Sequence, residues 1–299
     1  MRIVFLGSGE FGLASLKRLH QEHDVRAVIT APPRMAGRNR KPRVTPIGTF
    51  AKEHGLVLLE PENINDPKVI SQIESLDAEV MVVIAFGQKL NCEVLGDHFA
   101  INLHGSLLPR WRGAAPINAA IMHGDKTTGV SVISLADRMD AGLVYGTTST
   151  VIGETETAGE LHDRLAQLGP DLVMEVLAGD RCGEEQDEAL VTIAPKLSRS
   201  DAKLNLSGDA ETLARKIRGL SPWPGCRLAI AGVDCKVLRA IPNNESGNIG
   251  EILENGLLAV GDGSIEIAEL QPSGGKPMSW KDFCNGRQIE KGDLCEAIK

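Results

Sequence analysis

Short apolar runs alternate with amphipathic stretches along the first half of the chain. The runs are apolar throughout, which is typical of strands buried on both faces of a sheet. They cover Ile3–Leu6, Val25–Thr30, Val57–Glu60, Val80–Ala85, Ala100–His104 and Val130–Leu135. Most of the stretches between them have helical spacing, as in Gly12–His23, Thr45–His54 and Ala114–His123. This alternation predicts an α/β fold with an open, mostly parallel sheet and flanking helices, closed by a helix over Ala158–Ala178.

The pattern changes in the last third of the chain. The polar, acidic segment GDRCGEEQDEAL has no periodicity, which indicates a linker. After Ser207, a helix over Asp209–Gly219 precedes short strands joined by Gly, Asn and Asp turns. The predicted strands are Cys226–Ile230, Val233–Arg239, Gly250–Leu253, Leu257–Val260 and Ser264–Leu270. They indicate a small β-barrel. We therefore predict an α/β domain over 1–180, a linker over 181–206 and a second domain over 207–299.

Composition supports two domains in a protein without membrane segments. The chain has 299 residues, of which 42% are hydrophobic, enough for more than one core. The first apolar run is too short for a signal peptide, and no apolar run is long enough to span a bilayer. We expect a soluble cytoplasmic protein. The six cysteines form no CxxC pair and have no histidine at zinc spacing, so neither disulfides nor a bound metal is expected.

The charge is unevenly distributed. The net charge is −8, yet the residues from Lys196 onward carry 14 basic and 14 acidic side chains. In the acidic first part, the run from Arg34 to Arg43 has five positive charges. Such a run is either a solvated loop or a phosphate contact, because anionic partners respond to local rather than total charge.

The stretch GSGEFG, Gly7 to Gly12, matches a dinucleotide-binding fingerprint between a strand and a helix. That site also needs an acidic residue at the end of the second strand. The chain has Ala31-Pro32-Pro33-Arg34 there instead, although Arg34 could serve a 2′-phosphate. A nicotinamide-dependent oxidoreductase is therefore a weak alternative, and the glycines otherwise allow a tight turn.

Candidate chemistry lies in INLHGSLLPRWRGAAPINAAI. Asn102 and His104 are two residues apart at the end of a strand, so they share one face where open α/β folds bind ligands. An amide donor beside an imidazole suits acyl-type transfer. A group to orient the imidazole is available in LADRMDAG, where Asp140, next to a turn, is better placed than Asp137. Spacing alone does not decide between these two.

These motifs resemble the formyltransferases that use 10-formyltetrahydrofolate. INLHGSLLPRWRGAAPI resembles the family signature, and other similar segments follow the family's order along nearly the whole chain: VMVVIAFGQKL, DAG, LAQLGPDL, LSPWPG and LQPSGGKPMSWKDFCNG. The resemblance implies a Rossmann-like domain followed by an oligonucleotide-binding (OB-like) barrel that holds tRNA. It also implies that 10-formyltetrahydrofolate is the co-substrate and that the α-amino group of methionyl initiator tRNA is formylated for translation initiation. Neither a metal nor an obligate protein partner is implied.

The resemblance also assigns roles to individual residues. Asn102 and His104 would stabilise the oxyanion, while Asp140, paired with His104, would tune its protonation. Ser106 is not expected to be a nucleophile, because its context lacks the G-x-S-x-G pattern. Residues expected at the folate are Phe86, Gly87, Gln88, Leu90, Ser106, Leu107, Leu108, Pro109 and Asp137. Residues expected at the methionyl-tRNA are Phe11, Arg34, Arg38, Arg40, Lys41 and Arg43.

Two segments depart from the family pattern. Gly7-Ser8-Gly9-Glu10-Phe11 replaces Gly-Thr-Pro-x-Phe, and the run from Pro32 to Asn39 replaces Pro-Asp-Arg-Pro-Ala-Gly-Arg-Gly. Both lie on the acceptor side, so an amino sugar nucleotide or another small amine remains an alternative acceptor. The segment from Trp111 to Pro116 and the C-terminal domain favour tRNA. A non-catalytic RNA-binding module is a weaker alternative, disfavoured by the intact trio.

Overall fold

The computed structural model describes residues 1–36 and 41–298, and these form two compact units. The first unit is built from Met1–Arg112, Gly129–Ser149 and His162–Thr192. The second contains Ile193–Lys299 together with two segments from the first half of the chain, Gly113–Thr128 and Thr150–Leu161. No helix among the described residues is both long and apolar enough to cross a membrane.

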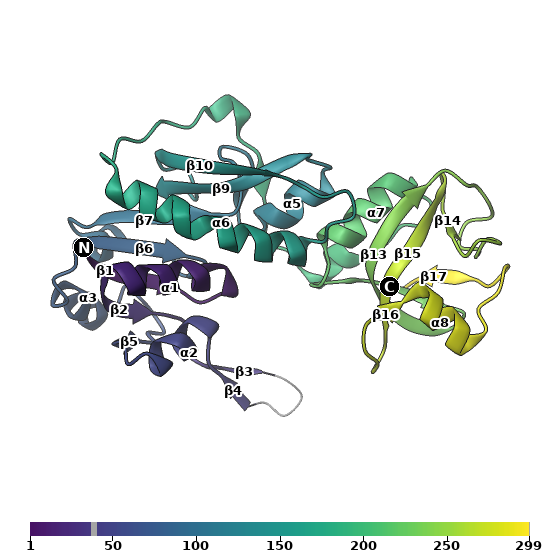
Figure 1. The fold of residues 1–299 in the computed structure, drawn as a ribbon, viewed down its shortest axis with the longest axis horizontal. Helices are drawn as coiled ribbons and strands as arrows, with labels where there is room; N and C mark the ends of the chain where they lie inside the picture. Colours follow the sequence, from purple (N-terminus) through teal and green to yellow (C-terminus); the bar gives the residue numbers. More distant parts are fainter. Residues whose placement is uncertain (37–40, 299) are drawn as a thin grey trace. The chain divides into compact units, whose positions relative to one another are not determined.

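A seven-stranded sheet forms the centre of the first unit, in the order β10-β9-β7-β6-β1-β2-β5 (Figure 1). Five neighbouring strands run parallel, and β9 runs antiparallel to β7, so the predicted open, mostly parallel sheet is confirmed. The strands are β1 (Arg2–Gly7), β2 (Asp24–Ile29), β5 (Leu58–Leu59), β6 (Val80–Ile84), β7 (Phe99–His104), β9 (Thr127–Ser134) and β10 (Val144–Val151).

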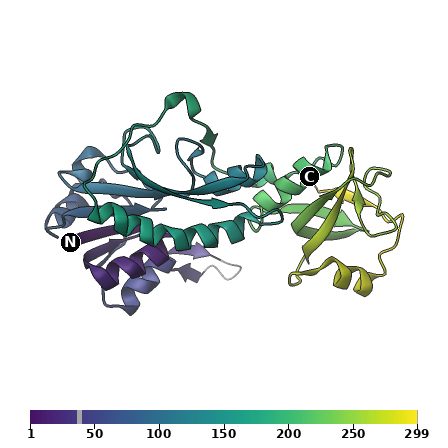
Figure 2. The same ribbon diagram turned by 45° about the horizontal axis from the view of Figure 1, so that its top comes forward.

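Helices cover both faces of this sheet, which is why its central strands are apolar throughout. On one face, Val4 and Leu6 of β1 share a buried cluster with Ile73 of α3. On the other face, Gly169 of α6 lies against Leu103 of β7 and near Ser15 of α1, and Figures 1 and 2 show α1 and α6 on the same side. The helices are α1 (Leu13–Glu22), α2 (Pro46–Glu53), α3 (Pro67–Glu74), α4 (Cys92–Leu95) and α6 (Ala158–Ala178).

The basic run between Arg34 and Arg43 differs from the simple loop that composition suggested. Its described ends form two short antiparallel strands, β3 (Arg34–Ala36) and β4 (Lys41–Arg43). A hairpin satisfies main-chain groups through its own ladder and needs no apolar pattern, so the sequence carried little sign of it.

An antiparallel barrel forms most of the second unit, in the strand order β14-β15-β13-β12-β17, with β16 paired to β15. The strands are β12 (Cys226–Ile230), β13 (Val233–Asn243), β14 (Leu258–Ala259), β15 (Ser264–Pro272), β16 (Met278–Ser279) and β17 (Cys295–Ala297). The helices of this unit are α5 (Pro116–Met122), α7 (Ala210–Gly219) and α8 (Trp280–Arg287). Residues of α7 and α8 complete the barrel core; Phe283 of α8, for example, is fully buried.

The prediction of a strand over Gly250–Leu253 is wrong. This segment makes only isolated bridges, one from Glu251 to Leu294 and one from Ile252 to Leu258. The two bridges reach different neighbours, so the segment nearly closes the barrel between β14 and the start of β17 instead of forming a regular ladder. The apolar pattern of this segment arises because Ile252 is buried where the segment nearly closes the barrel.

Short elements surround the predicted linker. They are η2 (Glu188–Leu190), β11 (Ile193–Ala194) and η3 (Arg199–Ala202), together with β8 (Arg112–Gly113), which pairs with β11. A further short element, η1 (Glu10–Gly12), lies between β1 and α1. The first part of the linker follows the sheet closely, since Glu184 forms an antiparallel bridge with Val144 of β10. An acidic, aperiodic sequence therefore acquires order from the strand beside it.

Candidate active site

Asn102 and His104 lie at the carboxyl end of β7, near the middle of the seven-stranded sheet. In the strand register, Asn102 pairs with Val83 of β6 and Ile133 of β9, and His104 pairs with Ser131 of β9. Alternate residues of a strand share a face, so both side chains project to the same side. His104 is 6% exposed, whereas Asn102 is half-buried. Among the described residues, no hydrogen bond occupies the Asn102 amide, which leaves it available to a ligand.

The carboxylate of Asp140 lies beside His104. Its Oδ2 is 3.6 Å from Nδ1 of His104, while Nε2 of His104 donates a hydrogen bond of 2.9 Å to the main-chain oxygen of Trp111. Both ring nitrogens therefore face oxygen acceptors, and only the protonated ring can donate to both. The separation of 3.6 Å exceeds the usual length of a charge-assisted hydrogen bond, so the contact orients the ring without fully occupying Nδ1. Asp137 is exposed.

Asp140 sits in a tight turn between β9 and β10. Its backbone has φ of 53°, in the left-handed region that residues other than glycine rarely adopt. The main-chain oxygens of Asp140 and Gly142 each accept a 2.8 Å hydrogen bond from Nε2 of Gln186. The sequence pattern gave no sign of Gln186, because it lies in the polar segment predicted to be a linker.

The loop after His104 is held by two serine hydroxyl groups, one in the loop and one in β9. Ser106 is fully buried and donates to the main-chain oxygen of Arg110 at 2.6 Å. Ser131 donates to the Ser106 oxygen at 2.7 Å and accepts from the Leu108 amide at 3.1 Å. Ser106 thus has a structural role. Leu108 is buried, while Leu107 and Pro109 are half-buried and available for contacts.

The loop after β6 offers mainly backbone to a ligand. Phe86 and Leu90 pack into the core, and the Gln88 side chain bonds the Ile64 amide at 2.8 Å and the Pro61 oxygen at 3.1 Å. Gly87 adopts φ of 86° and has open space where a Cβ would be. Of the residues expected here, Phe86, Gln88 and Leu90 could therefore contact a folate only through the main chain.

The expected acceptor residues within the described part of the chain lie on η1 and on the β3–β4 hairpin. Phe11 is 7% exposed, with its ring 5.4 Å from that of His162. Arg34 and Arg43 are exposed on the β3–β4 hairpin, and Lys41 is the first residue of β4. Arg38 and Arg40 lie within 37–40, outside the described residues.

Glycines of the GSGEFG turn serve close packing. A Cβ on Gly7 would lie 2.7 Å from the Ile84 oxygen, and one on Gly12 would lie 3.1 Å from the Phe5 ring. Gly7 and Gly12 are thus explained by the approach of the turn to β1 and β6, whereas a Cβ on Gly9 would meet no atom closer than 3.7 Å. No acidic ribose ligand follows β2, as noted from the sequence.

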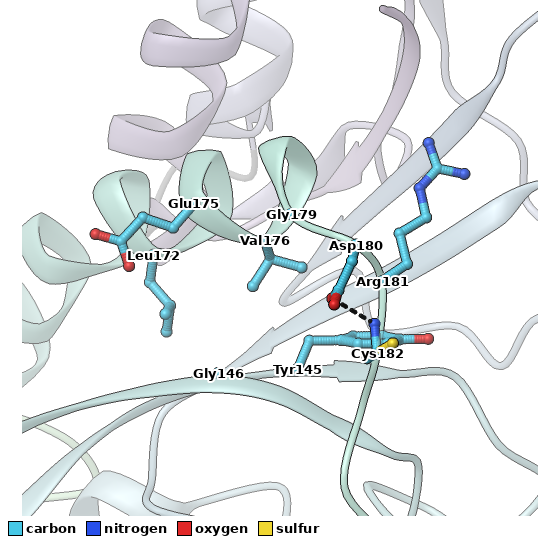
Figure 3. Close-up of a pocket in the computed structure, with 9 residues that line it drawn as sticks. All are labelled: Tyr145, Gly146, Leu172, Glu175, Val176, Gly179, Asp180, Arg181 and Cys182. Atoms are coloured by element: carbon cyan, nitrogen blue, oxygen red, sulfur yellow. Dashed lines mark hydrogen bonds between the residues drawn. The ribbon is translucent and has the colours of Figure 1, made fainter.

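A small hollow of about 140 Å³ lies on the first unit (Figure 3). It is formed between the end of α6, with Leu172 and Val176, and Tyr145 of β10. The Tyr145 ring contacts Phe99, which starts β7, so the hollow is at the opposite end of that strand from His104. Asp180 accepts a hydrogen bond from the Cys182 amide and raises the pKa of the Cys182 thiol, which disfavours a thiolate nucleophile.

A larger hollow, of about 640 Å³, lies on the second unit. Its lining includes four basic residues and no acidic one: Arg199, Lys203, Arg227 and Lys236. The indole of Trp223, 56% exposed, also lines it. A basic surface with an exposed aromatic ring suits a nucleic acid. In the described part of the chain, no cluster of three or more His, Cys, Asp or Glu side chains could hold a metal ion.

The fold of this chain, an α/β sheet followed by an antiparallel barrel, is similar to those of solved N-formyltransferase structures. The N-formyltransferase from Helicobacter canadensis, solved with folinic acid and dTDP-3-aminofucose, superposes with a TM-score of 0.65 at 16% identity, covering 88% of this chain and 97% of that one. HypX from Aquifex aeolicus, solved with tetrahydrofolic acid, gives a TM-score of 0.64 at 17% identity over 97% of this chain. This chain spans 48% of HypX.

The chain belongs to the formyltransferase family. Residues 1–177 match the formyl transferase model, and residues 196–288 match the model of the formyl transferase C-terminal domain. It is 41% identical to the methionyl-tRNA formyltransferase of Methylococcus capsulatus, over 97% of this chain and 98% of that protein. These matches confirm the resemblance found in the sequence motifs.

Proposed function

We propose that this protein transfers the formyl group of 10-formyltetrahydrofolate to the α-amino group of methionyl initiator tRNA. The observation that carries the proposal is the arrangement of Asn102, His104 and Asp140 at the end of β7. It occurs in a chain that aligns over nearly its full length with the methionyl-tRNA formyltransferase of Methylococcus capsulatus.

The residues around the trio fit a folate. Gly87 leaves open space beside the end of β6, and the partly exposed Leu107 and Pro109 lie in the loop after β7. These groups, with Asp137, would hold the pterin through backbone contacts and a few side chains. Once bound, 10-formyltetrahydrofolate supplies an activated formyl group whose carbon is the electrophile.

Each residue of the trio has a distinct task. The Asn102 amide is a donor for an oxygen that gains negative charge, and a protonated His104 ring would add its Nδ1–H; such donors are among the strongest catalytic contributors. The Asp140 carboxylate lies beside His104 and is placed to accept a proton from the attacking amine. The α-amino group, with an ordinary pKa of about 8, is partly uncharged near neutral pH and can attack the formyl carbon directly. The bond between that carbon and N10 of the folate then breaks, and tetrahydrofolate leaves with a proton on N10.

The acceptor can be identified by direct assay. The protein is incubated with 10-formyltetrahydrofolate and either methionyl initiator tRNA or a dTDP-amino sugar, and the formylated product of each is measured. We expect product only with the tRNA. Formylation of the amino sugar alone would replace the proposed acceptor, and tRNA binding without product from either would indicate an RNA-binding module.

The catalytic assignment predicts large losses of turnover. His104→Ala and Asp140→Asn should each lower kcat by about 100-fold or more, the usual loss when an oxyanion donor or acid–base group is removed. Asp171→Asn, an exposed carboxylate on α6, is the matched control and should retain normal kcat. Normal turnover in either trio variant would show that the trio is wrongly assigned.

A further inference from the structure

One side-chain amide links two segments of the candidate active site. Gln186 accepts a 2.9 Å hydrogen bond at Oε1 from Nε of Arg112, and its Nε2 donates to the main-chain oxygens of Asp140 and Gly142. Both amide protons and the amide oxygen are thereby used. Because an amide has one acceptor atom and one donor atom, only Gln or Asn can make this set of contacts.

Arg112 is itself firmly placed. Its side chain is 5% exposed, and Nη2 lies 3.0 Å from a carboxylate oxygen of Glu188. Glu188 also contacts Arg138 at 2.8 Å, and the hydrogen bonds from Arg138 and Arg112 lower the pKa of Glu188. The guanidinium is thus charge-compensated, so Gln186 is anchored on a rigid partner.

The same segment also holds the partner of His104. Thr192 accepts a 2.9 Å hydrogen bond at Oγ1 from the Trp111 amide, and its main-chain oxygen accepts one of 2.9 Å from the Arg112 amide. The Trp111 oxygen in turn accepts from Nε2 of His104. Residues 186–192 therefore contact the backbone of the Asp140 turn and also the backbone of Trp111, whose oxygen bonds His104.

We infer that Gln186 is a positioning residue for the reaction, which holds the Asp140 turn so that its carboxylate faces His104. The turn needs such support because Asp140 is held in the left-handed backbone region, which relaxes unless neighbouring contacts fix it. This inference rests on the proposed function, since it assigns Asp140 a catalytic task.

Substitution of Gln186 tests the inference. Gln186→Met keeps the length of the side chain but removes all three hydrogen bonds, and Gln186→Glu keeps an acceptor for Arg112 but loses both donors to the turn. We expect both to lower kcat by about 10–100-fold, the scale of a small misplacement of a catalytic group, and to change KM for methionyl-tRNA by less than about twofold. Gln72→Met, the same change on an exposed face of α3, should leave kcat unchanged.

A double variant separates positioning from general destabilisation. If Gln186 acts through Asp140, adding Gln186→Met to Asp140→Asn should cause no further loss of kcat, because residues that act as a unit are not additive. A kcat of the double variant that is lowered by the product of the two single losses would overturn the inference, as would normal kcat in Gln186→Glu. Thermal unfolding of each variant identifies any that does not fold. If Gln186→Met does not fold, the test is made with Gln186→Glu. If the wild-type protein forms no formylmethionyl-tRNA, the proposed function fails instead.

Discussion

At the scale of single residues, the candidate site depends on one close backbone approach. A Cβ on Gly142 would overlap the main-chain oxygen of Ser134, across the turn that carries Asp140. Glycine is therefore required by the available space, which explains the small residue in the DAG motif. Leu143 follows, and its amide donates to the Ser134 hydroxyl at 2.8 Å, so the turn is fastened on this side as well.

Gly142→Ala should push the Asp140 turn away from β9. We expect a loss of about 1–3 kcal/mol in the free energy of unfolding, typical of overpacking, together with reduced kcat. Chemical denaturation and steady-state kinetics measure the two effects. Gly286→Ala in α8, where a Cβ meets nothing within 4 Å, is the control and should be neutral or slightly stabilising. Equal behaviour of the two variants would contradict the packing argument.

At the scale of elements, the start of α6 is tied to the barrel within the second unit. The amide and hydroxyl of Thr157 each donate a 2.9 Å hydrogen bond to Oε2 of Glu160, and the Glu160 amide donates to the Thr157 hydroxyl at 3.4 Å, as in a capping box. Arg239 of β13 donates to both carboxylate oxygens of Glu160. The hydrogen bond from Arg239 is the main reason that the pKa of Glu160 falls from 4.5 to about 2.

This shift predicts a pH dependence of stability. Because the folded pKa lies below the ordinary value, Glu160 stabilises the fold above pH 4.5, and this contribution is lost as the pH falls toward about 2. Glu160→Gln should therefore lower stability at pH 7 and flatten its dependence between those pH values. Urea unfolding at several pH values measures this. Glu175→Gln, exposed on the same helix, is the control; a wild-type pH dependence in Glu160→Gln would contradict the assignment.

At the scale of the whole molecule, the protein has two basic surfaces although its net charge is −8. One is the β3–β4 hairpin with Arg34 and Arg43, and the other is the hollow lined by Lys203 and Lys236. A polyanion responds to such local concentrations of charge, so an acidic protein is compatible with a tRNA substrate.

Salt dependence tests the hollow as a tRNA contact. Lys203→Ala should raise KM for methionyl-tRNA and reduce the slope of log KM against log salt by about 0.9, the share of one phosphate contact, with little change in kcat. Lys291→Ala, an exposed lysine outside the hollow, is the matched control. An unchanged slope in Lys203→Ala would remove this residue from the tRNA interface.

The candidate site could be predicted from sequence only where its geometry is local. Asn102 and His104 share a face because strand side chains alternate, and this holds wherever the strand lies. Asp140 and Asp137 could not be separated by spacing, since the turn conformation decides which carboxylate meets His104. Gln186 carries no local signal at all: its partners Asp140 and Gly142 lie 46 and 44 residues away.

The sequence by itself determined most of the longer elements and the fold class, because burial on one or both faces imposes periodicity on the residues of a strand or helix. It placed α6 at Ala158–Ala178 and β12 at Cys226–Ile230, both as observed. Only the tertiary structure decided how the barrel closes through Glu251 and Ile252, and how Gln186 reaches the Asp140 turn. Those contacts join segments distant in the chain, and a hydrogen bond to a main-chain oxygen leaves no pattern in the residues that accept it.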